Sequence, residues 1–132
     1  MNSEQNKIVG SGSASPIGPT RSEQDGPVTM SPATANGVVI HEVSSWEGVS
    51  VCEHRRGGVE FRLGRRELGH LHGTIADLPF PRQVRDELVA AGRARPHHVL
   101  PGSGWVTVPM GTASEVANVI ELLRQNYQRA RQ

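Results

Sequence analysis

Three short runs of alternating apolar and polar residues follow one another near the middle of the chain, and glycine-containing turns separate them. The first run is Val49–His54, which precedes Arg56-Gly57-Gly58, and the second is Val59–Leu63, which precedes Gly64-Arg65. Alternation with a period of two, bounded by glycine, predicts β-strands joined as hairpins. We therefore expect an antiparallel meander whose third strand is Arg66–His72.

The length of the first loop decides which side chains face the core, because a slip of one residue exchanges the two faces of a strand. A three-residue loop over residues 56–58, with a glycine in the left-handed position, places four apolar side chains on one face. These are Val49, Val51, Phe61 and Leu63. In this register, Cys52 lies opposite Arg62 and His54 lies opposite Glu60 on the other face.

The second loop fixes where two of the histidines point. A two-residue turn sets Phe61 beside Leu68 on the core face and Arg62 beside Glu67 on the opposite face. By the same alternation, His70 and His72 share the core face with Leu68. A buried imidazole tends to stay neutral, so this register predicts a lowered pKa for at least one of them.

The rest of the chain predicts three helices and a fourth strand. Residues 36–46 suit a short amphipathic helix, residues 77–81 a helix entrance with proline in its first turn, and residues 81–91 the helix itself. Trp105–Met110 suits a strand. Thr112–Glu115 matches a capping box, and the apolar positions after it follow helical spacing. They are Val116, Val119, Ile120, Leu123 and Tyr127.

These elements define the expected fold class. We predict an α+β domain of the order α-β-β-β-α-β-α, with a mostly antiparallel four-stranded sheet and helices packed on one face. Residues 1–34 are rich in glycine, proline and serine and hold no aromatic residue, which predicts a disordered N-terminal tail. Residues 35–132 then form a single domain.

The amino-acid composition restricts the kinds of partner and site that the protein can have. From Ile40 onward the chain has twelve arginines, no lysine and ten acidic residues, a balance that gives no basic footprint for nucleic acid. Cys52 is the only cysteine, which rules out an intrachain disulfide and a zinc site built from cysteines. The sequence has neither a signal-peptide pattern nor an apolar run of membrane-spanning length, so we expect a cytoplasmic protein with no membrane partner.

Four of the six histidines lie between Gly64 and Trp105. His70 and His72 alternate on one predicted strand and project to one side, an arrangement that suits a metal with His97, His98 or Asp77 as a third ligand. Two other interpretations stay open, namely core histidines hydrogen-bonded to loop carbonyls or to Asp77, and a pocket for a nonmetal ligand. Since no metal motif is complete, we predict no cofactor.

Three further residues complete the predicted pocket. Arg82 and Arg85 lie near a helix N-terminus, where they would clamp an anion or, alternatively, remain solvated with Arg82 paired to Asp86. Trp105 serves either for packing or as a stacking platform. The full set of predicted pocket residues is His70, His72, Asp77, Arg82, Arg85, His97, His98 and Trp105.

Four motifs occur in a fixed order along the chain: HLHG at residues 70–73, DLPFP at 77–81, PHHVLP at 96–101 and SGWV at 103–106. Together they resemble the bacterial and fungal luciferase-domain family over residues 44–129. That family name carries no established light-producing chemistry. A weaker similarity in the order of elements connects the domain to MmcQ/YjbR-type proteins, which supports the fold more than any function.

The resulting functional expectation is a small ligand-binding or interaction domain whose partner is an unidentified small molecule or protein. The first alternative is a histidine-based enzyme, with or without a metal. The second is a DNA-binding protein of MmcQ/YjbR type, against which the near-neutral charge argues. The catalytic residues, if any, and the oligomeric state are not determined by the sequence.

Overall fold

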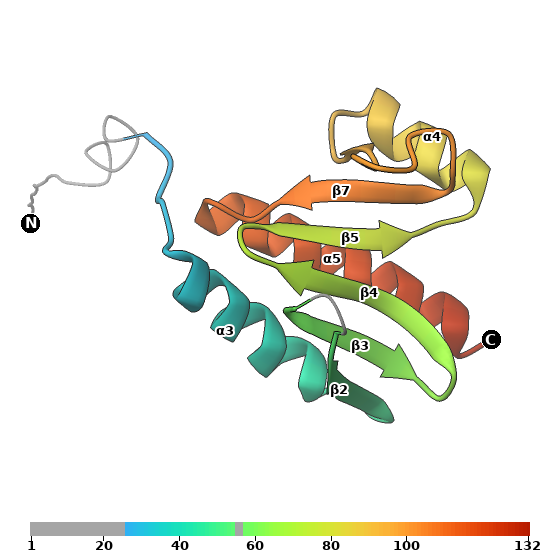
Figure 1. The fold of residues 1–132 in the computed structure, drawn as a ribbon, viewed down its shortest axis with the longest axis horizontal. Coiled ribbons are helices and arrows are strands. Elements are labelled where there is room, and N and C mark those ends of the chain that lie inside the picture. The colour runs from blue at the N-terminus through green and yellow to red at the C-terminus, as the bar shows by residue number, and fades with distance from the viewer. Residues whose placement is uncertain (1–25, 55–56) are drawn as a thin grey trace, which may run out of the picture.

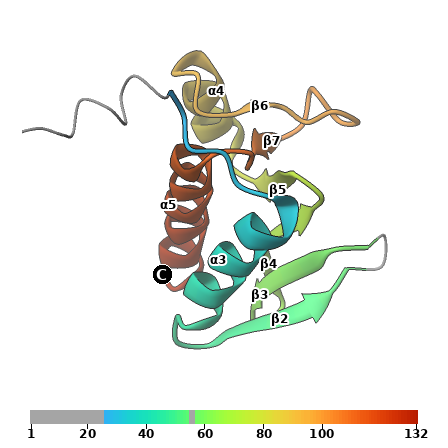
Figure 2. The same ribbon diagram turned by 90° about the vertical axis from the view of Figure 1, so that its left-hand side faces the viewer.

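A computed structural model describes residues 26–54 and 57–132 (Figure 1). In these residues an antiparallel six-stranded sheet packs against helices on one of its faces (Figure 2). The helices are α3 (Pro32–Ser44), α4 (Arg82–Ala90) and α5 (Ala113–Ala130). The strands are β2 (Val49–Glu53), β3 (Val59–Leu63), β4 (Arg66–His72), β5 (Ile75–Pro79), β6 (Arg95–Pro96) and β7 (Trp105–Pro109).

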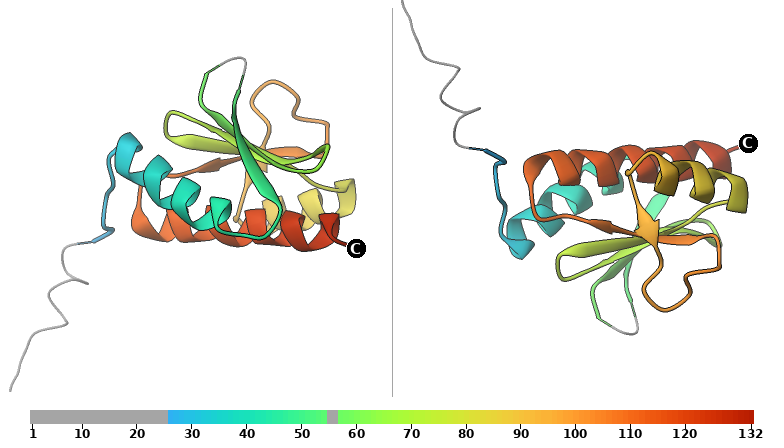
Figure 3. Two further views of the ribbon diagram at one scale, coloured as in Figure 1. Left: turned by 90° about the horizontal axis from the view of Figure 1, so that it is seen from below. Right: turned by 90° about the horizontal axis from the view of Figure 1, so that it is seen from above.

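The strand order in the sheet is β2-β3-β4-β5-β7-β6, and every neighbouring pair is antiparallel. The α+β class, the antiparallel sheet and the one-sided helices are therefore confirmed, but the sheet has six strands where four were expected. Figure 3 shows that strands β2 and β3 and the loop after β6 project from the face that the helices leave open.

The main missed strand is β5, whose sequence was interpreted as the entrance to α4. Ala76, Asp77 and Leu78 are all buried, because β5 lies in the sheet between β4 and β7. A strand buried on both faces does not alternate in polarity, so it lacks the usual sequence signal. The second missed strand, β6, has only two residues.

The final helix follows its prediction closely. Thr112 caps it by accepting a hydrogen bond from the Glu115 backbone N–H at 3.1 Å, and the Glu115 carboxylate accepts one from the Gly111 backbone N–H at 2.8 Å. One free N–H group of the first helical turn and the N–H of the residue before the cap are thereby satisfied. The predicted apolar face is buried against the sheet, with Ile120 only partly so.

The first helix begins earlier than expected. Ser31 caps α3, and Pro32 occupies its first turn, so the predicted domain boundary at residue 34 falls inside this helix. Just before it, the Val28 carbonyl accepts a hydrogen bond from the Ala113 N–H at 2.8 Å, and the Met30 N–H donates to the Gly111 carbonyl at 3.0 Å. The disorder predicted for residues 1–25 lies outside the described residues.

The first hairpin has the predicted faces but different partners. Val51 pairs with Phe61 on one face, whereas Cys52 pairs with Glu60 rather than with Arg62. The hairpin is closed by a hydrogen bond from the His54 N–H to the Gly58 carbonyl at 3.0 Å, which shifts the register by two residues and so preserves the faces.

The second hairpin contains a bulge, and this bulge reverses the predicted orientation of the histidines. Arg62 pairs with Glu67 as predicted, but Phe61 pairs with Gly69, which leaves Leu68 as an extra residue. Gly69 has φ +154°, and a Cβ atom there would lie 3.1 Å from the Asp77 carbonyl oxygen, so the bulge requires glycine.

Because of the extra residue, Leu68 and Leu71 both face the core, where they are 1% and 0% exposed. His70 and His72 instead point to the open face of the sheet. The prediction that they share the core face with Leu68 is therefore wrong. A bulge changes the parity of every later residue on its strand.

Candidate functional site

The centre of the open face is Asp77 on β5. It pairs across the sheet with His70 on β4 and with Thr107 on β7, so these three side chains lie in one row on the same face. The Asp77 side chain is only 2% exposed, and its Oδ1 accepts a hydrogen bond from the Thr107 hydroxyl at 2.7 Å. A buried carboxylate is therefore held in a fixed orientation.

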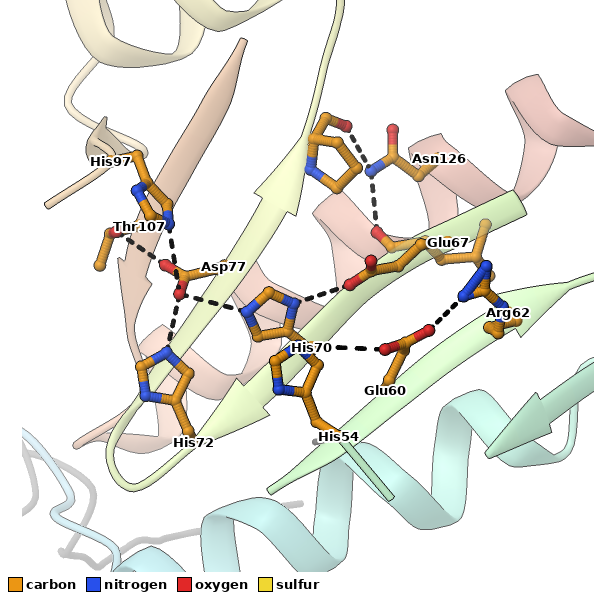
Figure 4. A network of polar contacts seen from close by, with 12 residues as sticks. His54, Glu60, Arg62, Glu67, His70, His72, Asp77, His97, Thr107 and Asn126 are labelled. Carbon is orange, nitrogen blue, oxygen red and sulfur yellow. Dashed lines mark hydrogen bonds and ion pairs between the residues drawn. The ribbon is translucent and has the colours of Figure 1, made fainter. Parts of the chain in front are cut away.

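Four imidazole rings converge on the other oxygen of this carboxylate, and Figure 4 shows His70, His72 and His97 among them. The distances from Asp77 Oδ2 to the Nε2 atoms are 2.7 Å for His72, 3.3 Å for His98, 3.4 Å for His70 and 3.5 Å for His97. A carboxylate oxygen has two lone pairs and cannot accept four good hydrogen bonds. Hydrogen bonding to Asp77 Oδ2 therefore does not account for the presence of all four rings.

The protonation of the centre follows from its charges. Burial raises the pKa of Asp77, but hydrogen bonds from His70, His72 and Thr107 outweigh burial and hold that pKa well below its ordinary range. Burial lowers the pKa of His70, but hydrogen bonds and attraction to Asp77 and Glu67 outweigh burial and raise it to about 9. The lowered pKa predicted for a core-side histidine is therefore wrong for His70, which lies between two carboxylates.

Glu67 orients His70 from the side away from Asp77. Its Oε2 lies 2.7 Å from His70 Nδ1, so the Nδ1–H donates to Glu67 and the Nε2 atom faces the centre. A metal-binding histidine usually makes a contact of this kind through its second nitrogen. Sequence reasoning assigned Glu67 only to a pair with Arg62, because residues three apart on a regular strand face opposite ways.

The loop after β6 brings in the other two histidines. His97 Nδ1 accepts hydrogen bonds from the backbone N–H groups of Val99 and Leu100, at 3.1 Å and 3.0 Å. The His97 and His98 rings stack with centroids 4.4 Å apart. Burial lowers the pKa of His97, which keeps this ring neutral.

Between this loop and the β2–β3 hairpin lies an open hollow of about 800 Å³. Five of the six histidines of the chain line it; the sixth, His41, is exposed on α3. The Trp105 ring forms part of the wall, with centroids 5.5 Å from that of His70 and 6.1 Å from that of His97. The hollow therefore joins a polar centre to an aromatic surface.

The structure brings six of the eight predicted pocket residues together in this hollow. They are His70, His72, Asp77, His97, His98 and Trp105. The other two belong to α4 and do not line it. Arg82 is exposed, and Arg85 pairs with Asp86 at 2.6 Å and donates a hydrogen bond to the Pro101 carbonyl. Arg85 therefore anchors the histidine-bearing loop, and Asp86 pairs with it rather than with Arg82.

Sequence reasoning missed several polar residues of the site. They are His54, Glu60, Arg62, Glu67 and Thr107. The His54 and His70 rings stack with centroids 4.2 Å apart, and Arg62 pairs with Glu60. The sequence places His54 and Glu60 on the polar face of the first hairpin. That face becomes part of the site because His70 points to it rather than to the core.

Within residues 26–54 and 57–132, two overlapping sets of three side chains have ligand atoms close enough to hold one metal ion. One set is His70, His72 and Asp77, and the other is Asp77, His97 and His98. Within each set the ligand atoms lie within 4.8 Å of one another. The first set stands entirely on paired strands and is the more rigid of the two.

The fold and the site define a small α+β domain with a histidine-rich hollow on the open face of its sheet. Residues 65–126 match the family model described as the Luciferase domain, in agreement with the resemblance that the motifs indicated. The match runs from the start of β4 into α5 and includes Glu67 and all six predicted pocket residues of the hollow. No curated protein and no solved structure matches the chain.

Among residues 26–54 and 57–132, no helix has both the length and the apolar character needed to cross a lipid bilayer.

Proposed function

We propose that this protein is a metal-dependent ligand-binding domain, which holds a divalent transition-metal ion through His70, His72 and Asp77 and binds a small molecule in the hollow above it. The observation that carries the proposal is the convergence of imidazole Nε2 atoms on Asp77 Oδ2. Without an ion, this arrangement concentrates more donors on one oxygen than it can accept.

The distances support the proposal. A metal ion with bonds of about 2.0–2.1 Å to nitrogen and oxygen keeps neighbouring ligand atoms about 2.9 Å apart in octahedral and about 3.3 Å apart in tetrahedral geometry. The Asp77 Oδ2 atom lies 2.7 Å from His72 Nε2 and 3.4 Å from His70 Nε2. The second length is close to a tetrahedral edge, and the first is slightly shorter than an octahedral one, so both atoms lie within reach of one ion with Asp77.

The groups around the ligands support it as well. Glu67 fixes the tautomer and orientation of His70, and the Thr107 hydroxyl fixes the orientation of the Asp77 carboxylate. Such outer contacts tune metal sites in general and hold the ligands in place before the ion arrives. Neighbouring side chains of the sheet therefore hold His70 and Asp77 in position without an ion.

The donor set selects the class of ion. Two imidazoles and one carboxylate suit zinc, iron, nickel or copper, whereas magnesium and calcium prefer oxygen donors alone. Three protein ligands also leave coordination positions open, and here those positions face the hollow. A bound molecule would complete the coordination. The same opening would serve a metal-dependent enzyme, which is the runner-up function.

DNA binding has weaker support. Among the residues that the structure describes, the hollow is lined by the carboxylates of Glu53, Glu60, Glu67 and Asp77 and by one arginine, Arg62. Such a surface repels phosphate rather than attracting it.

The test is a metal titration of the purified full chain after treatment with a chelator. We expect one Zn²⁺ or Co²⁺ ion per chain by calorimetry, and a Co²⁺ absorption spectrum typical of nitrogen and oxygen ligands. Both should disappear in His72→Ala and in Asp77→Asn. His41→Ala, which removes the one histidine outside the hollow, should bind as the parent does. A parent protein that binds no ion would overturn the proposal.

A further inference from the structure

We infer that His97 is not a metal ligand but a hydrogen-bond donor, whose Nε2–H binds an oxygen atom of the molecule held by the metal. The hollow would then select oxygen-donor molecules with an apolar body, such as ketones, phenolates or hydroxamates. This inference rests on the proposed metal site and names the class of ligand that the site takes.

The tautomer of His97 carries the argument. Its Nδ1 accepts two backbone hydrogen bonds, from Val99 and Leu100, so that nitrogen has no proton. A neutral imidazole carries one proton, which must then sit on Nε2. A protonated nitrogen has no lone pair for a metal ion. His97 therefore cannot ligate through Nε2, although it lies close enough to do so.

His70 is the instructive contrast. Its Nδ1–H donates to Glu67, which leaves Nε2 free to bind a metal ion once its proton is displaced. The two rings point their Nε2 atoms at the same oxygen of Asp77, but the Nδ1 atom of His70 donates a hydrogen bond whereas that of His97 accepts them. The Nε2 atom of His70 can therefore bind a metal ion, whereas the Nε2–H group of His97 can only donate a hydrogen bond.

The Nε2–H group of His97 makes at best a weak hydrogen bond with Asp77. The distance from His97 Nε2 to Asp77 Oδ2 is 3.5 Å, at the limit for a hydrogen bond. That same oxygen is 2.7 Å from His72 Nε2, and Oδ1 is taken by Thr107. An oxygen atom bound to the metal ion beside Asp77 would offer His97 a nearby acceptor.

The His97 ring is also fixed in position. It stacks on His98, lies edge-on to Trp105 with an interplanar angle of 68°, and its side chain is only 11% exposed. Its loop is anchored by the Arg85 side chain, which donates to the Pro101 carbonyl. A donor held in this way needs little reorganisation to bind a ligand.

The walls of the hollow define the rest of the ligand. Trp105 offers an aromatic surface, and Val99 and Leu100 are 64% and 51% exposed at the rim. Apolar side chains exposed around a polar centre suit a ligand with an apolar body.

The test uses the full chain loaded with Co²⁺ and two variants. His97→Asn keeps an acceptor oxygen near the position of Nδ1 and removes the donor. His97→Gln restores an N–H group near the position of Nε2. The probes are benzohydroxamic acid, which binds metals through oxygen and has an aromatic body, acetohydroxamic acid, which lacks that body, and azide, which has no oxygen.

We expect Co²⁺ affinity to stay within about twofold of the parent in both variants. Affinity for benzohydroxamic acid should fall about 10-fold in His97→Asn, the size of one lost hydrogen bond, and should recover in His97→Gln. Azide affinity should fall less, because the nitrogen atoms of azide accept hydrogen bonds more weakly than a hydroxamate oxygen does. The parent should bind benzohydroxamic acid more tightly than acetohydroxamic acid.

Several outcomes would overturn the inference while leaving the metal site intact. A loss of Co²⁺ affinity of 10-fold or more in His97→Asn, with an altered Co²⁺ spectrum, would make His97 a ligand. If His97→Asn left the affinity for benzohydroxamic acid unchanged, or lowered the affinity for azide equally, His97 would not be a donor to an oxygen atom of the ligand. Tighter binding of acetohydroxamic acid than of benzohydroxamic acid would rule out a preference for ligands with an apolar body. A parent that binds no Co²⁺ would instead defeat the proposed function itself.

Discussion

The Nδ1 atom of His70 lies 2.7 Å from the Oε2 atom of Glu67, although the two residues are three positions apart on one strand. On a regular strand they would face opposite sides of the sheet. The extra residue at Leu68 rotates the strand by one position and puts both side chains on the open face. One bulge therefore supplies the orienting carboxylate and turns His70 toward the site.

Replacing Glu67 tests this contact. We expect Glu67→Gln to weaken metal binding by about 10- to 100-fold, because outer contacts to a metal-binding histidine are typically worth that much. The measurement is calorimetric titration of the full chain with Zn²⁺. The matched control is Glu121→Gln, an exposed position on α5, which should leave affinity unchanged. Equal affinity in the parent and Glu67→Gln would show that the contact does not orient a ligand.

The glycine of the bulge gives a second prediction. Gly69→Ala places a methyl group 3.1 Å from the Asp77 carbonyl oxygen and at an unfavourable φ of +154°. We expect a loss of about 1–3 kcal/mol in the free energy of unfolding, measured by urea denaturation, together with weaker metal binding. Gly37→Ala, on the exposed side of α3 with no atom near the new methyl, should be neutral or stabilising. Similar effects from both changes would mean that the bulge tolerates a side chain.

Stability should depend on pH through His70. Its pKa in the folded protein is about 9, above the ordinary value of 6.5, because Asp77 and Glu67 favour the charged ring. The stabilisation is complete below pH 6.5 and is lost as the pH rises to 9. We expect the metal-free protein to lose up to about 3 kcal/mol across this window, by urea denaturation at each pH.

The control for that experiment is His70→Gln, which cannot be charged and should show a much smaller loss over the same window. If the parent were as stable at pH 9.5 as at pH 6, the ring would not be charged in the folded protein.

The segment before α3 should be part of the domain. The Val28 carbonyl and the Met30 N–H are hydrogen-bonded to the start of α5, and Met30 packs against the core. We expect a chain beginning at Gly26 to melt at nearly the parent temperature, and a chain beginning at Ala35 to melt several degrees lower. Melting can be followed by circular dichroism. If both truncated chains matched the parent, these contacts would not contribute to stability.

The core position of α5 can be tested by shortening one side chain. Leu123 is 1% exposed, so Leu123→Ala should cost about 2–5 kcal/mol of unfolding free energy. Leu100→Ala, at a position that is 51% exposed, should cost less than about 0.5 kcal/mol. Chemical denaturation of both variants gives the comparison. A small effect at Leu123 would show that α5 does not seal the sheet.

The sequence by itself determined the fold class, the final helix, the faces of the first hairpin and six of the residues that meet in the hollow. These depend on local signals. Capping by Thr112 and Glu115, helical spacing after Val116, and alternation around Gly57-Gly58 all act over a few residues. The motif order also determined the family resemblance, which the match over residues 65–126 supports.

The tertiary structure alone decided which way the histidines point. The bulge at Leu68 is stabilised by the fit of Gly69 against β5 and α5, through contacts with Asp77, Leu78 and Leu123 that no local pattern records. It also decided that residues 75–79 form a central strand, because that strand is buried between two neighbours rather than alternating. Parity along a strand is set by pairing across the sheet, and pairing is a non-local property. The site on the open face, rather than in the core, follows from that single residue of register.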